Sequence, residues 1–154
     1  MFVSWIRKDS FELDLEILSS KLLLDKNGIL KAFETDQSLC YGIYDKELLV
    51  GIFCAVELDK TILINNFAYI SNVNKTYRER IINLFFKNLR TQKTVLIVAK
   101  SDEIELFKSF EFVTYGNFLK ATYRGGAVFN FTNAMGKHIS NENYLHTIKQ
   151  IDFL

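Results

Sequence analysis

The sequence predicts a single α/β domain built on a mixed, mostly antiparallel central sheet of about seven strands, with helices on both faces. Three observations carry this prediction. Three β-rich runs follow one another between residues 39 and 73. An amphipathic helix, a continuous apolar run and a second helix come next, and this order produces a parallel pair of strands. Two further strand-like runs then complete the sheet.

A short strand and two helices are expected ahead of the main sheet. Residues 2–6 indicate the opening strand, and Ser10 is placed to cap the helix that follows. The apolar residues of this helix recur at spacings of four, three and four: Phe11, Leu15, Leu18 and Leu22. Asn27–Gly28 then interrupts the chain, so we expect a second, short helix over Ile29–Phe33.

The middle of the chain reads as three antiparallel strands in sequence. The β-rich runs are Leu39–Tyr44, Leu48–Val56 and Thr61–Val73, and the last of them is long for one strand. Asp45–Glu47 suits a hairpin between the first two runs, and Asp59–Lys60 provides the next turn. These links are short and polar, which favours a meander of neighbouring strands.

The most secure helix follows the third run directly. Thr76 and Glu79 have the spacing of a capping box, and apolar residues continue at helical spacing: Ile81, Ile82, Leu84, Phe85, Phe86 and Leu89. Thr94–Ala99 is a continuous apolar run, as expected of a strand covered on both faces. Asp102 then caps a further helix that carries Ile104, Leu106, Phe107 and Phe110.

Two closing strands and a terminal helix end the pattern. Phe112–Tyr123 and Ala127–Phe131 flank Gly125–Gly126, and Glu142–Phe153 has Tyr144, Leu145, Ile148 and Ile151 at helical spacing. We therefore expect one domain over residues 1–131 and a C-terminal helical extension over residues 132–154. Because this last helix has no cap, it is a candidate contact for a second copy of the chain or for a second domain.

Composition excludes several classes of function. A formal charge of +1 provides no basic field for nucleic acid, and the first apolar stretch ends at Arg7, too early for a signal peptide or a membrane span. Cys40 and Cys54 lie in strand-like runs, far from His138 and His146, and form no zinc pattern. We expect a cytoplasmic protein with two buried free thiols and no metal, nucleic-acid or membrane partner.

One segment combines a strand end, a helix start and several cations. Val73–Asn83 contains Lys75, Arg78 and Arg80 where an α-helix begins and its unpaired N–H groups attract anions. Cations in a first turn oppose the helix dipole, so they are better explained beside a phosphate than alone. A solvated basic patch is the alternative explanation.

The order of elements together with this segment resembles the GNAT N-acetyltransferases over about residues 1–131. Val73, Tyr77 and Arg78 match the strand-to-helix motif of that family, and Glu105–Phe112 is similar to its later helix that leads into a strand. The resemblance implies that acetyl-CoA or another acyl-CoA binds along this segment and that a small-molecule or peptide amine accepts the acyl group. The implied cofactor-binding residues are Ser71, Asn72, Val73, Arg78, Glu79, Arg80, Ile81, Ile82 and Asn83.

The sequence also departs from the family pattern. Ile81 and Asn83 stand where the family has small residues, usually glycine, and Phe107 stands in place of its tyrosine. No catalytic residue is identified. The candidates are Glu57 or Asp59 as a base acting through water, and Tyr69 or Tyr115 as an acid. Each is better explained as a solvated carboxylate or a packed tyrosine. An acyl-CoA-dependent N-acyltransferase is the first hypothesis. The second is a GNAT-fold module without catalysis that binds CoA or serves as the structural half of a larger assembly.

Overall fold

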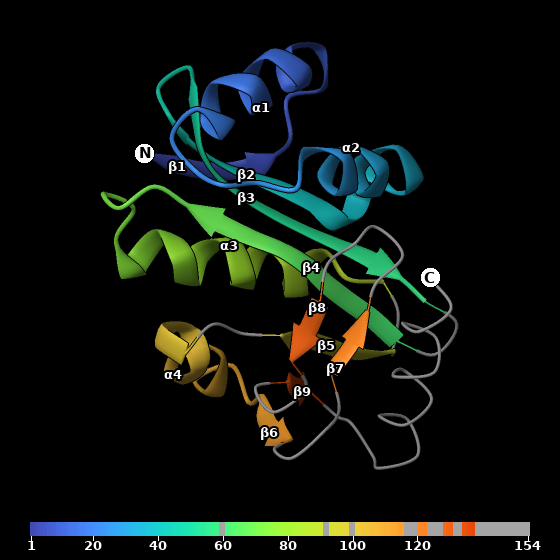
Figure 1. Cartoon of the computed structure of the whole chain (residues 1–154). Helices are drawn as coiled ribbons and strands as arrows, with labels where there is room; N and C mark the ends of the chain where they lie inside the picture. The colour runs from blue at the N-terminus through green and yellow to red at the C-terminus, as the bar shows by residue number, and fades with distance from the viewer. Residues whose placement is uncertain are drawn as a thin grey trace. The chain divides into compact units, whose positions relative to one another are not determined.

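The computed structural model describes residues 1–58, 61–90, 93–98, 101–115, 120–122, 128–130 and 134–137 (Figure 1). The chain forms two compact units. The first consists of Met1–Val56 and Asn66–Thr91, and the second of Glu57–Asn65 and Gln92–Leu154. One strand, β4 (Thr61–Tyr69), contributes its first half to the second unit and its second half to the first.

The first unit is built on the strands β1 (Phe2–Trp5), β2 (Cys40–Asp45), β3 (Leu48–Glu57) and the end of β4, in that hydrogen-bonded order. β1 and β2 are antiparallel, and so are β2 and β3. The β2–β3 hairpin turns at Lys46, whose φ of 56° lies in the left-handed region. The backbone N–H of Ile70 then bonds the carbonyl of Val50 at 3.0 Å, which fixes the end of β4 beside β3.

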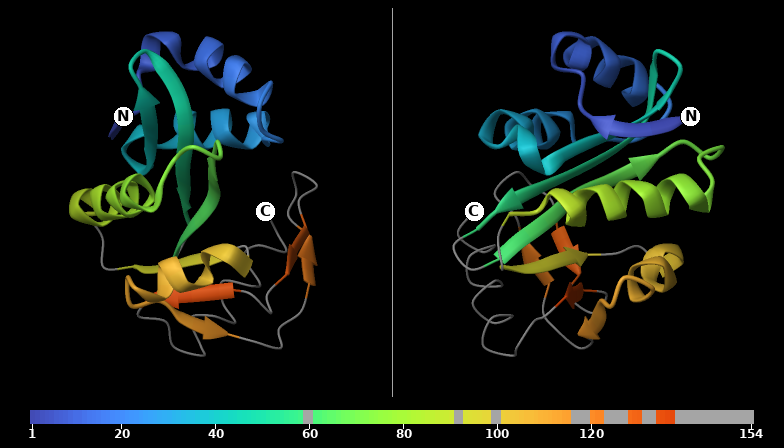
Figure 2. Two further views of the ribbon diagram at one scale, coloured as in Figure 1. Left: turned by 90° about the vertical axis from the view of Figure 1, so that its left-hand side faces the viewer. Right: turned by 180° about the vertical axis from the view of Figure 1, so that it is seen from behind.

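Helices cover both faces of these strands, as Figure 2 shows. On one face lie α1 (Phe11–Ser19) and α2 (Lys26–Thr35), and on the other lies α3 (Lys75–Asn88). A short 3₁₀ turn precedes α1, and another follows α2. The core under α1 and α2 is aliphatic and aromatic, with these residues at its centre: Phe11, Leu15, Leu18, Ile29, Cys40, Tyr44, Ile52 and Cys54.

The core under α3 is chiefly aromatic. The ring of Phe85 lies 5.0 Å from that of Phe53 and 6.3 Å from that of Tyr41, and Phe53 lies 5.4 Å from Phe67. Such offset and edge-on ring pairs contribute beyond their buried area. Phe53, Phe67 and Phe85 therefore form an aromatic cluster where α3 meets the sheet.

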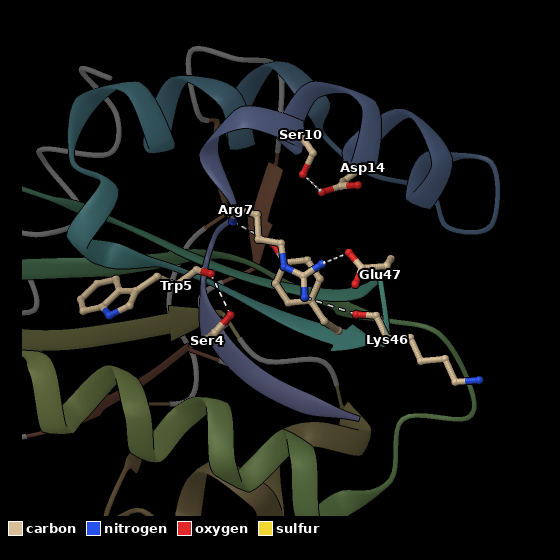
Figure 3. Close-up of polar contacts among 8 residues, drawn as sticks. Ser4, Trp5, Arg7, Ser10, Asp14, Lys46 and Glu47 are labelled. Atoms are coloured by element: carbon tan, nitrogen blue, oxygen red, sulfur yellow. Dashed lines mark hydrogen bonds and ion pairs between the residues drawn. The ribbon is translucent and has the colours of Figure 1, made fainter.

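Arg7 ties the end of β1 to the β2–β3 hairpin, as Figure 3 shows. Its backbone N–H donates to the Tyr44 hydroxyl at 2.9 Å, and its guanidinium lies over the Tyr44 ring at 4.3 Å. The same guanidinium donates to Glu47 Oε2 at 3.0 Å and to the Lys46 carbonyl at 3.3 Å. One side chain thus joins parts of the sheet that lie far apart in the sequence.

In the second unit the strand order is β4, β5 (Thr94–Val98), β9 (Ala134–Lys137) and β6 (Val113–Tyr115). β4 and β5 are parallel, paired from Thr61 with Thr94 to Ile64 with Ile97. β9 is antiparallel to both of its neighbours. A 3₁₀ turn (Ser101–Glu103) leads into α4 (Ile104–Lys108), and β7 (Lys120–Thr122) pairs with β8 (Val128–Asn130) in a separate two-stranded sheet.

The fold class predicted from the sequence is confirmed: a mixed, mostly antiparallel sheet of seven strands with helices. The parallel β4–β5 pair and the burial of both cysteines are confirmed as well. β9 was not indicated by the sequence pattern. It lies in the segment 132–154 that we predict as an extension, and that division of the chain stays a prediction.

Several predicted helix starts are wrong. Ser10 precedes α1, but its hydroxyl donates to Asp14 Oδ2 at 2.7 Å and does not cap the helix. Asn27–Gly28 does not interrupt the chain, because Asp25 accepts the Gly28 N–H at 3.1 Å and α2 begins at Lys26. A Cβ at Gly28 would lie 2.2 Å from Asp25 Oδ2, so this glycine serves the cap.

Two later boundaries also differ from the prediction. The third β-rich run ends as a strand at Tyr69, four residues before Val73. Asp102 lies inside the 3₁₀ turn, so α4 starts after it without a side-chain cap. The Asp59–Lys60 turn, Gly125–Gly126, both histidines and the helix predicted over Glu142–Phe153 lie outside the described residues.

Candidate anion and cofactor site

The predicted cofactor segment lies between β4 and α3, in the first unit. After β4 the chain turns, and the Val73 N–H bonds the Ile70 carbonyl at 3.1 Å. Asn74 is the N-cap of α3: its side-chain oxygen accepts the Tyr77 N–H at 3.3 Å. The capping box predicted for Thr76 and Glu79 is therefore wrong, because the helix starts earlier, at Lys75.

The early start of α3 decides which backbone groups are open to a ligand. In an α-helix each N–H bonds the carbonyl four residues earlier, except in the first turn. The N–H groups of Glu79–Asn83 are thus inside the hydrogen-bond ladder of α3. The N–H groups of Tyr77 and Arg78 bond Asn74. The N–H groups of Lys75 and Thr76, in the exposed first turn, are the ones that α3 presents to an anion.

Arg78 is held against the end of β4. Its guanidinium lies 5.2 Å from the centre of the Tyr69 ring, and its Nη1 approaches the Tyr69 hydroxyl at 3.4 Å, a long contact. Its Nε is buried and has no hydrogen-bond partner among the described residues. An unsatisfied buried donor costs about 1–3 kcal/mol, and more on a charged group. The oxygen of a bound anion would satisfy this donor.

The other charges of the segment leave it cationic. Lys75 forms an i,i+4 ion pair with Glu79 at 3.7 Å, and this acid is the single one in the first two turns. Arg80 is exposed and lies over the Tyr77 ring at 5.0 Å. The first two turns of α3 thus contain three cations and one carboxylate, at the positive end of the helix dipole. A group with two or more negative charges, such as a diphosphate, therefore fits this end of α3.

The predicted cofactor-binding residues divide into three groups. Ser71 and Asn72 are exposed in the turn, and Asn83 is exposed on α3. Arg78, Glu79 and Arg80 carry the charges described above. The remaining three, Val73, Ile81 and Ile82, are buried in the core of the unit, at 2% exposure or less. Their side chains point away from solvent, so only the first two groups present side chains to a ligand.

The candidate catalytic groups are occupied elsewhere. Glu57 forms an ion pair with Lys93 at 2.7 Å. Phe107 is fully buried and its ring packs 5.2 Å from that of Phe112, so this position is part of the core of the second unit. Tyr69 contacts Arg78, and of Tyr115 only the strand backbone is described. Asp59, His138 and His146 lie outside the described residues.

The two cysteines form a buried pair. Cys40 and Cys54 are directly opposite each other on β2 and β3, and neither is exposed. Burial raises the pKa of the Cys54 thiol, and the hydrogen bond with Cys40 adds to this effect. A nucleophilic cysteine needs a lowered pKa and access to solvent, so these thiols are structural.

Among the described residues no three histidine, cysteine or acidic side chains lie close enough to hold a metal ion. In the same part of the chain, no helix is both long and apolar enough to cross a bilayer.

The sheet order, the parallel β4–β5 pair and the helix that follows β4 define a mixed α/β fold. No protein-family profile matches the sequence, and no curated protein is similar to it in sequence. Solved structures are similar. A candidate acetyltransferase of the GNAT family from Bacteroides thetaiotaomicron is 12% identical, with a TM-score of 0.67 over 100% of this chain and 97% of its own.

Two further structures support the same conclusion. Naa50 from Arabidopsis thaliana, in complex with the bisubstrate analogue CoA-Ac-MVNAL, is 13% identical, with a TM-score of 0.65 over 89% of this chain and 97% of its own. A candidate acetyltransferase from Pyrococcus horikoshii is 16% identical, with a TM-score of 0.63 over 80% of this chain, which spans 47% of that protein. The chain has the GNAT fold, in a divergent form.

Proposed function

We propose that this protein is an acyl-CoA-dependent N-acyltransferase that binds the diphosphate of its cofactor at the start of α3. The observation that supports it lies at the cationic end of the helix: the buried Nε of Arg78 has no hydrogen-bond partner among the described residues. The proposed cofactor-binding residues remain those of the sequence prediction, Ser71–Val73 and Arg78–Asn83. Among them, the buried Val73, Ile81 and Ile82 would support the segment from the core, and the exposed and half-buried residues would contact the cofactor. Within the same segment, the N–H groups of Lys75 and Thr76 would donate to the phosphate oxygens.

Each charged residue has a distinct part in this proposal. Arg78, whose guanidinium contacts Tyr69, would donate a charge-assisted hydrogen bond to the phosphate through Nε. Lys75 and Arg80 are exposed, so they would attract the phosphate through charges that the solvent screens. Bound acyl-CoA would supply the acyl group as a thioester. We assign no general base, so rate enhancement would rest on holding an amine beside the thioester. The acceptor is a small-molecule or peptide amine; Naa50 was solved with a peptide-containing analogue.

The second candidate is a GNAT-fold module without catalysis. Burial of Ile81 and Phe107 favours it, because both replace residues that the family uses at its cofactor and acid positions. The two candidates differ in turnover, and the second needs no CoA site if the module serves as the structural half of a larger assembly. Binding and turnover therefore have to be measured separately.

Calorimetric titration with acetyl-CoA tests the site. We expect Arg78→Ala to weaken binding about tenfold to a hundredfold, because a hydrogen bond to a charged group contributes about 1.5–3 kcal/mol. Arg90→Ala is the matched control, since Arg90 is exposed beyond the other end of α3 and should leave the affinity unchanged. Equal affinity of both variants would refute the proposed position of the cofactor.

Turnover decides between the candidates. Acetyl-CoA consumption is followed by chromatography with a panel of amines and amino-terminal peptides. Product formation that is lost together with binding in Arg78→Ala supports the enzyme. Tight binding without product for any amine supports the non-catalytic module.

A further inference from the structure

A surface groove lies between α1 and α2, away from the start of α3 in the sequence. Its cavity has a volume of about 470 Å³, which is within the range of known ligand-binding clefts. Four lining residues come from α1 and three from α2: Glu12, Leu13, Leu15, Glu16, Lys26, Asn27 and Leu30. Leu15 is buried and belongs to the core, so it forms an apolar floor.

The groove carries an excess of negative charge. α1 contains three acids, Glu12, Asp14 and Glu16, and no basic residue. Glu16 forms an ion pair with Lys26 across the groove, and Asp14 accepts a hydrogen bond from Ser10. Glu12 forms no ion pair with a described residue, although it lines the groove. The groove therefore offers a carboxylate beside apolar walls to a cation.

Exposed apolar side chains continue from the groove onto the outer side of α1. Leu13 is 65% exposed and Ile17, one turn later on α1, is 38% exposed. Both lie opposite Leu15 and Leu18, which face the core, so α1 is apolar on its outer side as well. Next to an apolar-floored groove, these two side chains make α1 a candidate interaction surface.

We propose that the α1–α2 groove and the outer face of α1 form a docking surface for a cationic amphipathic segment of a partner protein. Its apolar side chains would cover Leu13 and Ile17 and enter the groove, and its Lys or Arg would pair with Glu12. An anionic membrane or a nucleic acid is disfavoured by the three acids of α1. A small amine would fill the groove but leave the outer face uncovered.

The probe is a fluorescein-labelled helical peptide of about fifteen residues, made of Leu on one face and Lys on the other. Anisotropy is measured at about 0.15 M salt. We expect Leu13→Ser to weaken binding about tenfold, from the lost burial of one leucine, and Glu12→Lys to weaken it severalfold. Both residues are exposed, so circular dichroism should show an unchanged fold.

Two matched controls lie on the same unit outside the surface. Leu48→Ser removes a leucine that is 46% exposed on β3, and Glu34→Lys reverses an exposed charge on α2. We expect both to bind the peptide as the unchanged protein does. Equal losses in the controls, equal binding of a Leu/Glu peptide, or no binding of the Leu/Lys peptide would overturn the proposal. Full displacement of the peptide by hexylamine would indicate a small-molecule site instead.

Discussion

Ile81 provides the sharpest test of how α3 is built. Its side chain is fully buried in the first unit, at a helix position where the resemblance implies a small residue. Replacing a buried isoleucine by alanine costs about 2–5 kcal/mol, and glycine adds about 1 kcal/mol inside a helix. We therefore expect Ile81→Gly to destabilise the protein by about 3–6 kcal/mol, a large part of the stability of a typical domain.

Urea denaturation followed by circular dichroism measures this loss. Asn83→Gly is the control, because Asn83 lies on the same helix, is exposed and also occupies a family glycine position. It should cost less than about 1 kcal/mol, the difference in helix propensity. A cost below about 1 kcal/mol for Ile81→Gly, similar to that of Asn83→Gly, would refute the packing role of Ile81.

Three other outcomes are expected from the described contacts. Asn74→Ala should lower the unfolding free energy by about 1 kcal/mol through loss of the α3 cap, whereas Thr76→Ala should change it little; the reverse order in urea melts would restore the Thr76 capping box. Burial raises the pKa of Tyr41 from 10.0 to about 12, so the folded state retains this proton longer than the unfolded state, and stability should fall by about 2–3 kcal/mol between pH 10 and pH 12. That part of the decrease should be absent in Tyr41→Phe, and identical profiles of the two proteins would contradict it. At pH 8 both thiols should resist iodoacetamide in the folded protein and react in urea, as mass spectrometry would show; rapid labelling of the folded protein would mean that Cys40 and Cys54 are accessible.

The periodicity of the sequence was sufficient to predict most elements. Alternation and apolar runs indicated β2, β3 and β5, and the spacing of Ile81, Ile82 and Phe85 indicated α3. These predictions are confirmed because each pattern reflects a face of the helix or strand that must be buried. The order of elements then identified the fold before any structural comparison.

The helix boundaries depended on which of several polar side chains caps the helix, and the sequence alone does not decide between them. Asp25 and Asn74 cap helices that we predicted from Gly28 and Thr76, because several polar residues near a helix start compete for the same N–H groups. β9 pairs with strands far away in the sequence, and its four residues carry no alternating pattern. Non-local pairing of this kind leaves little local signal.

From the sequence, the candidate site could be predicted only as a segment of cations at a helix start. The contact of Arg78 with Tyr69 depends on β4 ending at Tyr69, which the long β-rich run concealed. Ile81 was predicted as one of the apolar residues at helical spacing, and the structure buries it fully. The full set of cofactor-binding residues stays a prediction.

The buried Ile81 also bears on how reversible the divergence of this fold is. A core position requires a large apolar side chain that fills the space, whereas a position facing a phosphate requires a small residue such as glycine. Because the core is closed around isoleucine, a change to glycine would cost about 3–6 kcal/mol of stability. A glycine at this position would need compensating changes among the other buried residues of α3, Ile82 and Phe85. Packing at one helix position can thus make the divergence a one-way change.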